Sequence, residues 1–180
     1  MPRHDRAQTP LRVGRDVSAE APRPRPGTVK RSLARLAAVQ ALYQIDLGDA
    51  APESAITELR ERAAEEEGFG EADDELFVDL VRGAIANRDD IDALLSAALG
   101  PEWPLARLDA VLRALLRVGG YELLGRLEIP ARVVLNEYLD IAHAFFSGKE
   151  PGLANGVLDR LAHRLRASEL TAGGDAEAAG

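Results

Sequence analysis

A short cationic segment near residue 30 carries the residue types best suited to binding chemistry. Lys30, Arg31 and Arg35 fall in the first two turns of a predicted helix, and Arg31 and Arg35 share one helix face because they are four residues apart. The planar guanidinium group of arginine suits phosphates and base edges. Further arginines precede this segment, so the residues indicate local binding of a polyanion. A basic tail that only keeps the protein in solution explains the same composition equally well.

Catalytic groups are few. Asp140 and His143 are three residues apart, and Asp159 and His163 are four apart, so each pair shares a helix face. Metal sites in helical bundles use such pairs together with further glutamates on facing helices. We interpret both as ordinary surface pairs, and a metal-dependent bundle enzyme is the alternative. The chain has no cysteine, and it has neither a P-loop nor a serine-centred elbow motif. We therefore predict no enzymatic activity, no cofactor and no bound metal.

The elements that must position these residues are helices. Apolar residues make up 46% of the 180 residues but aromatic residues only 4%, so alanine and leucine must fill the core. Helical spacing of apolar residues predicts an all-α fold, a compact bundle of about six to seven helices. The helices are expected at about residues 28–47, 52–67, 74–99, 105–127, 130–145 and 153–165. Residues 1–27 are predicted to be a disordered basic extension rich in proline and arginine, 28–167 the helical domain, and 168–180 a disordered tail.

The charge is distributed unevenly along the chain. Residues 1–35 carry a net charge of +6, whereas the remaining residues carry −14, which gives −8 for the whole chain. An acidic body with a basic arm binds nucleic acid only locally and suits a basic partner protein. The sequence has no apolar run near the roughly 20 residues that a membrane span needs, and no secretory signal. We therefore expect a cytoplasmic protein that does not bind membranes.

Three stretches, in this order and spacing, resemble one known family. Residues 38–43 read Ala-Val-Gln-Ala-Leu-Tyr after an arginine-containing start, and residues 112–123 contain Leu-Arg followed by Tyr-Glu-Leu. Residues 129–159 contain Ile-Pro, then Val-Val-Leu-Asn-Glu, then Asn-Gly-Val-Leu-Asp. From about residue 30 to residue 165 the chain is similar to the NusB family of bacterial transcription antitermination factors. The resemblance implies a NusB-like helical domain without enzymatic activity.

The resemblance also implies a function and its partners. Family members bind boxA-type single-stranded RNA of ribosomal-RNA operon transcripts together with the small-subunit ribosomal protein NusE. The complex acts on transcribing RNA polymerase with other Nus factors. Carried over by position, the resemblance implies RNA-binding roles for Lys30, Arg31, Arg35, Gln40, Tyr43, Lys149 and Leu153. It implies contacts with the partner protein for Asp109, Leu112 and Arg113.

Two alternatives remain open at the level of sequence. Tyr43 lies at helical spacing from Leu36 and Val39, so it fits a core residue as well as an RNA contact. The whole chain also fits a helical scaffold for protein–protein interactions, including one that forms homodimers, with RNA binding only incidental. We further expect Arg113 and Arg117 to lie on a solvated face or to pair with Glu122 and Asp109.

Overall fold

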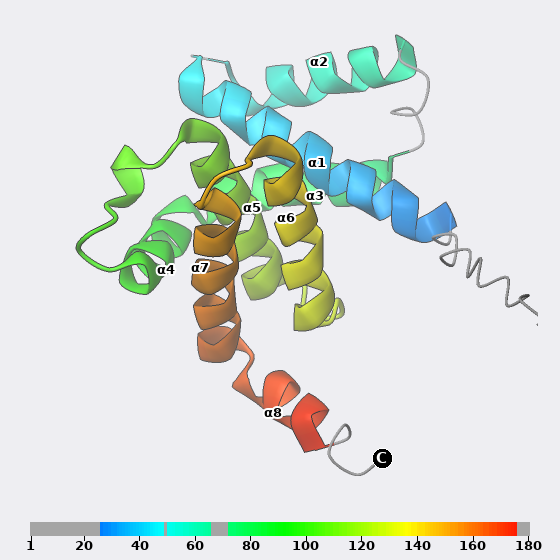
Figure 1. Cartoon of the computed structure of the whole chain (residues 1–180). Helices are drawn as coiled ribbons and strands as arrows, with labels where there is room; N and C mark the ends of the chain where they lie inside the picture. Colours follow the sequence, from blue (N-terminus) through cyan, green and yellow to red (C-terminus); the bar gives the residue numbers. More distant parts are fainter. Residues whose placement is uncertain (1–25, 49, 66–71, 176–180) are drawn as a thin grey trace, which may run out of the picture.

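The computed structural model describes residues 26–48, 50–65 and 72–175, and this part of the chain is all-α (Figure 1). The prediction of an all-α bundle is confirmed, with eight α-helices in the described residues instead of six or seven. A short 3-10 turn, η2, covers Leu105–Arg107. The expected disordered extension lies outside the described residues up to position 25, and its last two residues already belong to the first helix. The helices are α1 Pro26–Leu47, α2 Pro52–Glu65, α3 Asp74–Ala86, α4 Arg88–Leu99, α5 Ala110–Gly125, α6 Ala131–Phe145, α7 Glu150–Leu165 and α8 Ala167–Asp175.

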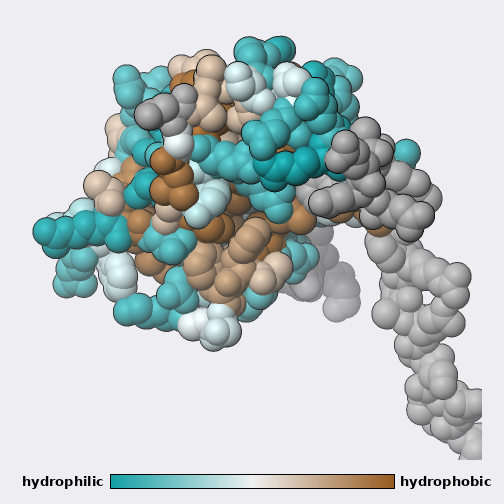
Figure 2. Space-filling view, turned by 90° about the horizontal axis from the view of Figure 1, so that it is seen from above, coloured by the Kyte–Doolittle hydropathy of each residue, from teal (hydrophilic) through white to brown (hydrophobic). Residues whose placement is uncertain are grey.

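Helix α5 is the centre of the bundle. It packs against α1, α3, α4, α6 and α7, while α2 packs against α1 and α3 along the upper side of the molecule (Figure 1). Ten of its residues are buried, because α5 faces neighbours on nearly all sides. Viewed from above, hydrophobic residues gather in the middle of the surface, with hydrophilic residues around them (Figure 2).

Two adjacent glycines inside α5 allow the neighbouring helices to approach closely. A Cβ atom on Gly119 would lie 3.2 Å from the Tyr138 ring and 3.3 Å from Leu158, and one on Gly120 would lie 3.2 Å from Ile91. Glycine inside a helix costs about 1 kcal/mol relative to alanine, so its presence here has to be offset by packing. This is the close approach that the sequence predicts for these glycines.

We expect Gly119→Ala to lower the free energy of unfolding by about 1–3 kcal/mol, because the added methyl group would press on the Tyr138 ring, which is fully buried and held by the hydrogen bond of its hydroxyl to Glu122. Gly152→Ala is the matched control in α7, where no atom lies within 4 Å of the added Cβ. That variant should be neutral or more stable by up to about 1 kcal/mol. Urea unfolding of both variants checks the prediction, and two changes of the same sign would contradict it.

The single helix predicted over residues 74–99 is in fact two helices that meet at Asn87. The Asn87 side chain donates a hydrogen bond to the Gly83 carbonyl oxygen at 2.8 Å, and the Asn87 backbone N–H donates to the same oxygen at 3.1 Å. Such local side-chain bonds compete with helix continuation. The break lets α3 pack against α1 while α4 packs against α5 and α7. An apolar periodicity that continues across the break conceals it in the sequence.

The predicted disordered tail from residue 168 is wrong for residues 168–175, which belong to α8. The carboxylate of Glu169 in this helix accepts a hydrogen bond from the Ala131 backbone N–H at 2.9 Å. That N–H belongs to the first turn of α6, whose N-cap residue, Pro130, makes no side-chain capping bond. Glu169 therefore caps α6 from a distant part of the chain, an interaction that no local sequence pattern predicts.

Candidate nucleic-acid interface

The first turns of α1 carry two exposed cations. Lys30 and Arg31 are both exposed, and neither forms an ion pair with any residue that the structure describes. The Lys30 carbonyl oxygen accepts a hydrogen bond from the Asp73 N–H at 3.0 Å, which joins this part of α1 to the start of α3. The N-terminal end of α1 projects past the other helices (Figure 1). The two side chains therefore lie where an extended polyanion can reach them.

Arg35, the third predicted cation, is buried in the bundle. Its side chain is 1% exposed, and it donates two hydrogen bonds from Nε to the Glu122 carboxylate, both at 3.0 Å, and a third from Nη2 at 2.5 Å. Its Nη1 lies 3.4 Å from the Glu137 carboxylate, and the Tyr138 hydroxyl donates to Glu122 at 2.8 Å. The prediction that Arg35 joins Arg31 on an RNA-binding face is wrong for this folded state, because its guanidinium is buried and paired with Glu122 and Glu137.

The physical reason is the position of Arg35 along α1. Residues four apart in a helix differ by about 40° around the axis and about 6 Å along it. Arg31 lies near the projecting end, and one further turn brings Arg35 opposite α5 and α6. Burial opposes the charge of Arg35, but the hydrogen bonds and negative charge of Glu122 outweigh it and raise the pKa of Arg35. Burial and the charge of Glu122 also raise the pKa of Tyr138 well above its ordinary value.

Gln40 and Tyr43, predicted further along α1, are both half-buried. Tyr43 packs against the core from its edge, so the core interpretation that the sequence leaves open is correct for its ring. Partial exposure is compatible with a second role, and the RNA contacts of both residues stay predictions.

The second predicted RNA stretch lies at the turn between α6 and α7. Lys149 is exposed, and its ammonium lies over the Trp103 ring, 4.7 Å from the ring centroid. Leu153 is half-buried one turn into α7. Lys149, Trp103 and Leu153 all line a pocket of about 280 Å³, which we call the Trp103 pocket. Asp109 and Leu112, predicted to contact a partner protein, line the same pocket, so the fold brings the two predicted sites together.

The predicted partner residues at the start of α5 have different environments. The Asp109 carboxylate caps α5 by accepting hydrogen bonds from the N–H groups of Val111, at 2.8 Å, and Leu112, at 3.3 Å. Leu112 itself is 2% exposed, so the prediction of a partner-facing side chain there is wrong: it is a core residue that contributes to the wall of the pocket. Arg113 is half-buried and bonds weakly to the carbonyl oxygens of residues 106 and 108, both at 3.4 Å.

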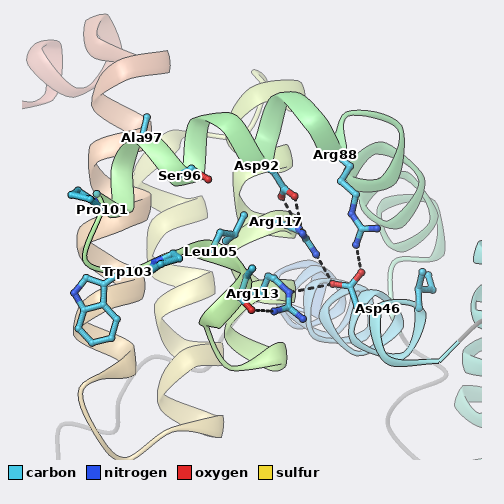
Figure 3. Close-up of a pocket in the computed structure, with 14 residues that line it drawn as sticks. Asp46, Arg88, Asp92, Ser96, Ala97, Pro101, Trp103, Leu105, Arg113 and Arg117 are labelled. Atoms are coloured by element: carbon cyan, nitrogen blue, oxygen red, sulfur yellow. Dashed lines mark hydrogen bonds and ion pairs between the residues drawn. The ribbon is translucent and has the colours of Figure 1, made fainter.

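Trp103 also lines a larger groove, of about 1150 Å³ (Figure 3). Asp46, at the end of α1, is 3% exposed at its side chain and pairs with Arg88 and with Arg117, the latter at 2.6 Å. Arg117 also donates two hydrogen bonds to Asp92, both at 2.7 Å. Figure 3 shows Trp103 at the far end of the groove from Asp46. This ion-pair network ties α1, α4 and α5 together.

The expected pairing of Arg113 and Arg117 with Glu122 and Asp109 is therefore wrong. Arg117 pairs with Asp46 and Asp92, and the Arg113 guanidinium lies 3.9 Å from the Asp46 carboxylate. Glu122 is on the opposite side of α5 and belongs to Arg35. Sequence reasoning also missed Trp103. Its one available signal was that it is the only tryptophan of the chain and stands in a proline-rich loop.

The carboxylate–histidine pairs are surface features. His163 lies 3.4 Å from the Asp159 carboxylate, with both side chains about half exposed, and His143 and Asp140 are exposed. Within the described residues, no three histidine, aspartate or glutamate side chains gather closely enough to hold a metal ion. In the same part of the chain, none of the helices combines the length and the apolar character that crossing a membrane requires.

Comparisons with known proteins decide the relationship of this chain. The NusB family model matches residues 32–163. The chain belongs to the NusB family. The transcription antitermination protein NusB of Rhodopseudomonas palustris (strain BisB18) is 45% identical over 148 residues, which cover 80% of this chain and 88% of that protein. NusB of Maricaulis maris (strain MCS10) is 44% identical over 158 residues, or 86% and 98% of the two chains.

Solved structures agree with this assignment. NusB of T. maritima superposes with a TM-score of 0.66 at 29% identity, covering 78% of this chain and 96% of that one. A crystal structure of antitermination factors NusB and NusE in complex with dsRNA contains a chain that superposes with a TM-score of 0.62 at 25% identity, covering 74% and 96%. The NusB family match begins at Ser32, so Lys30 and Arg31 lie just outside it, and α8 lies beyond its other end.

Proposed function

We propose that this protein is a transcription antitermination factor that binds boxA-type single-stranded RNA of ribosomal-RNA operon transcripts. In this proposal it binds the RNA together with the ribosomal protein NusE and acts on transcribing RNA polymerase with other Nus factors. It has no catalytic role, and it works in the cytoplasm, where transcription takes place. The name shared by its relatives, transcription antitermination protein NusB, supports the general role.

The observation that carries the RNA-binding part is the exposed pair Lys30 and Arg31 at the projecting end of α1. Both side chains are charged, and neither is held by an acidic partner among the described residues. Such cations bind phosphate groups, and phosphate contacts supply a large share of the binding free energy in protein–nucleic acid complexes. Lys149 at the turn before α7 is the third exposed cation of the proposed site.

The acidic body supports the protein-binding part. Residues beyond position 35 carry a net charge of −14, which complements a basic partner such as a ribosomal protein. The surface that we propose for NusE lies at the start of α5, around Asp109 and Arg113. The same charge also fits the alternative of a helical scaffold that forms homodimers. A light-scattering mass near 19.3 kDa would contradict that alternative.

We expect the double variant Lys30→Ala/Arg31→Ala to bind a labelled boxA-type oligonucleotide more weakly at every salt concentration. Two lost phosphate contacts should reduce the slope of log K against log salt concentration by roughly 1.4 on a single strand. The matched control is Arg132→Ala/Arg164→Ala, which removes two exposed cations near the start of α6 and the end of α7. Fluorescence anisotropy between about 50 and 200 mM salt measures both effects.

Two outcomes would contradict the proposal at different levels. Equal affinity and equal slope for the wild type and the Lys30/Arg31 variant would overturn the assignment of RNA binding to the start of α1. An absence of any salt-dependent binding by the wild type, with and without NusE, would overturn the function itself.

A further inference from the structure

The Trp103 pocket contains an exposed aromatic side chain that is not among the residues of the proposed RNA or NusE sites. Trp103 is the only tryptophan of the chain, and 37% of its surface is exposed, which is unusual for the largest apolar side chain. It stands in the loop between α4 and η2, far in sequence from Lys149, whose ammonium lies 4.7 Å from the centre of its ring. The fold therefore joins an exposed π face to an exposed cation.

This pairing has the two components that unpaired nucleotides require. A base stacks on an aromatic face, and the adjoining phosphate is neutralised by a lysine or arginine. Arg107 lines the same pocket as Trp103 and Lys149 and adds a second cation. Leu153 also lines the pocket, but it is aliphatic and offers no π face. Within this pocket, Trp103 is the one aromatic side chain on which a base can stack.

We propose that Trp103 is a base-stacking residue of the RNA site, with Lys149 holding the phosphate next to the stacked base. The inference rests on the proposed RNA-binding function and extends it from the start of α1 to the loop that precedes α5. It adds to the RNA-binding surface a residue outside the predicted site. A strand that reaches Trp103 must place one unstacked base there.

The charges around the pocket bear on the choice between RNA and a protein ligand. Glu102, Asp109 and Glu150 also line it, and three free carboxylates would favour a basic peptide. The Asp109 carboxylate, however, is used at the N-terminus of α5, where two backbone N–H groups donate to it. The cation that lies over the indole ring belongs to the protein itself, so Lys149 would repel a basic side chain of a partner and attract a phosphate. A base next to that phosphate would stack on the ring face that Lys149 does not cover. The charge of Lys149 therefore favours a base with its phosphate over a basic peptide.

Trp103 reports on its own contact, because no other tryptophan contributes to the emission. We expect titration of the full-length protein with a boxA-type oligonucleotide to quench the tryptophan fluorescence with the same Kd that anisotropy gives. Trp103→Leu should raise that Kd about tenfold, within the range that loss of one base–aromatic stack produces. The Kd of Trp103→Phe should lie between those of the wild type and Trp103→Leu, because phenylalanine keeps a smaller aromatic face. Leu127→Ala is the control, since it removes another exposed apolar side chain, 67% exposed, in the loop between α5 and α6.

A set of oligonucleotides, each with one abasic nucleotide, tests stacking directly. One member of the set should bind the wild-type protein about tenfold more weakly, as expected for one lost stack, and should bind Trp103→Leu no more weakly than the intact oligonucleotide does. An abasic nucleotide that weakens binding to the wild type but not to Trp103→Leu supports a base on the indole ring, since a general loss of fold does not produce this non-additive pattern. Thermal unfolding followed by circular dichroism establishes that the variants are folded.

The remaining outcomes separate this inference from the proposed function. RNA binding without quenching, and with equal Kd for wild type and Trp103→Leu, would overturn the role of Trp103 and leave the proposed function intact. Loss of NusE binding by Trp103→Leu with unchanged RNA binding would also overturn it, in favour of a protein contact. No RNA binding by the wild type would overturn both.

Discussion

Replacing Arg35 with methionine should lower the free energy of unfolding by about 3–5 kcal/mol, because it leaves a charged Glu122 buried without its partner. Methionine fills most of the vacated volume, so the loss reports on the charge pair and less on a cavity. Arg31→Met, one turn earlier and exposed, is the matched control and should change stability by less than about 0.5 kcal/mol. Urea unfolding measures both variants.

A second substitution distinguishes the charge pair from simple packing. Glu122→Gln removes the carboxylate charge and keeps an oxygen that can accept the hydrogen bond of the Tyr138 hydroxyl. The double variant Arg35→Met/Glu122→Gln should therefore be more stable than the sum of the two single losses implies. A loss below about 1 kcal/mol for Arg35→Met, or strict additivity, would contradict a buried ion pair at the centre of the bundle.

This result would also change how RNA-binding variants of α1 are interpreted. An Arg35 substitution that weakens RNA binding would act through the position of α1 against α5 and α6, not through a lost phosphate contact. Lys30 and Arg31 are free of this complication because both are exposed. They are therefore the residues on which a test of the interface should rest.

The sequence predicts the helices well wherever apolar residues alone determine them. The glycine pair in α5 is an example, since two helix-unfavourable residues in a strongly apolar helix predict the close packing that Tyr138 and Ile91 confirm. The break at Asn87 was missed because one side chain, and not the periodicity, ends α3.

The site was harder to predict for a different reason. The sequence shows that Arg35 is a cation on a helix, but whether it meets solvent or Glu122 depends on a residue 87 positions away. The pairing of Lys149 with Trp103 likewise joins segments that are distant in the chain. Charge type and helix face are local properties that a sequence shows, whereas the burial of a charge depends on tertiary contacts.

Arg166 is the clearest case of such a contact, and sequence reasoning did not single it out. It is 3% exposed at the end of α7, and its guanidinium donates to four backbone carbonyl oxygens. The acceptors belong to Glu122, Leu123, Arg126 and Ile129, at 3.0, 2.7, 2.8 and 2.6 Å. These carbonyl groups lie in the last turn of α5 and in the loop to α6, where a helix runs out of N–H donors of its own. Those of Glu122 and Arg126 each accept one backbone N–H as well, from Arg126 and Ile129, both at 3.1 Å. A positive charge at this end is also favoured by the helix dipole.

We therefore expect Arg166→Met to lower the free energy of unfolding by about 3–5 kcal/mol, since several buried carbonyl groups lose a charged donor at once. Arg164→Met, exposed two residues earlier, should change it by less than about 0.5 kcal/mol. Arg166→Lys separates charge from geometry: a single ammonium cannot reach four acceptors that surround a planar fork, so most of the loss should remain. Denaturant unfolding gives the energies, and hydrogen exchange should show faster exchange at residues 126–129. Full recovery by lysine would show that the charge alone, and not the four-carbonyl geometry, secures the end of α5.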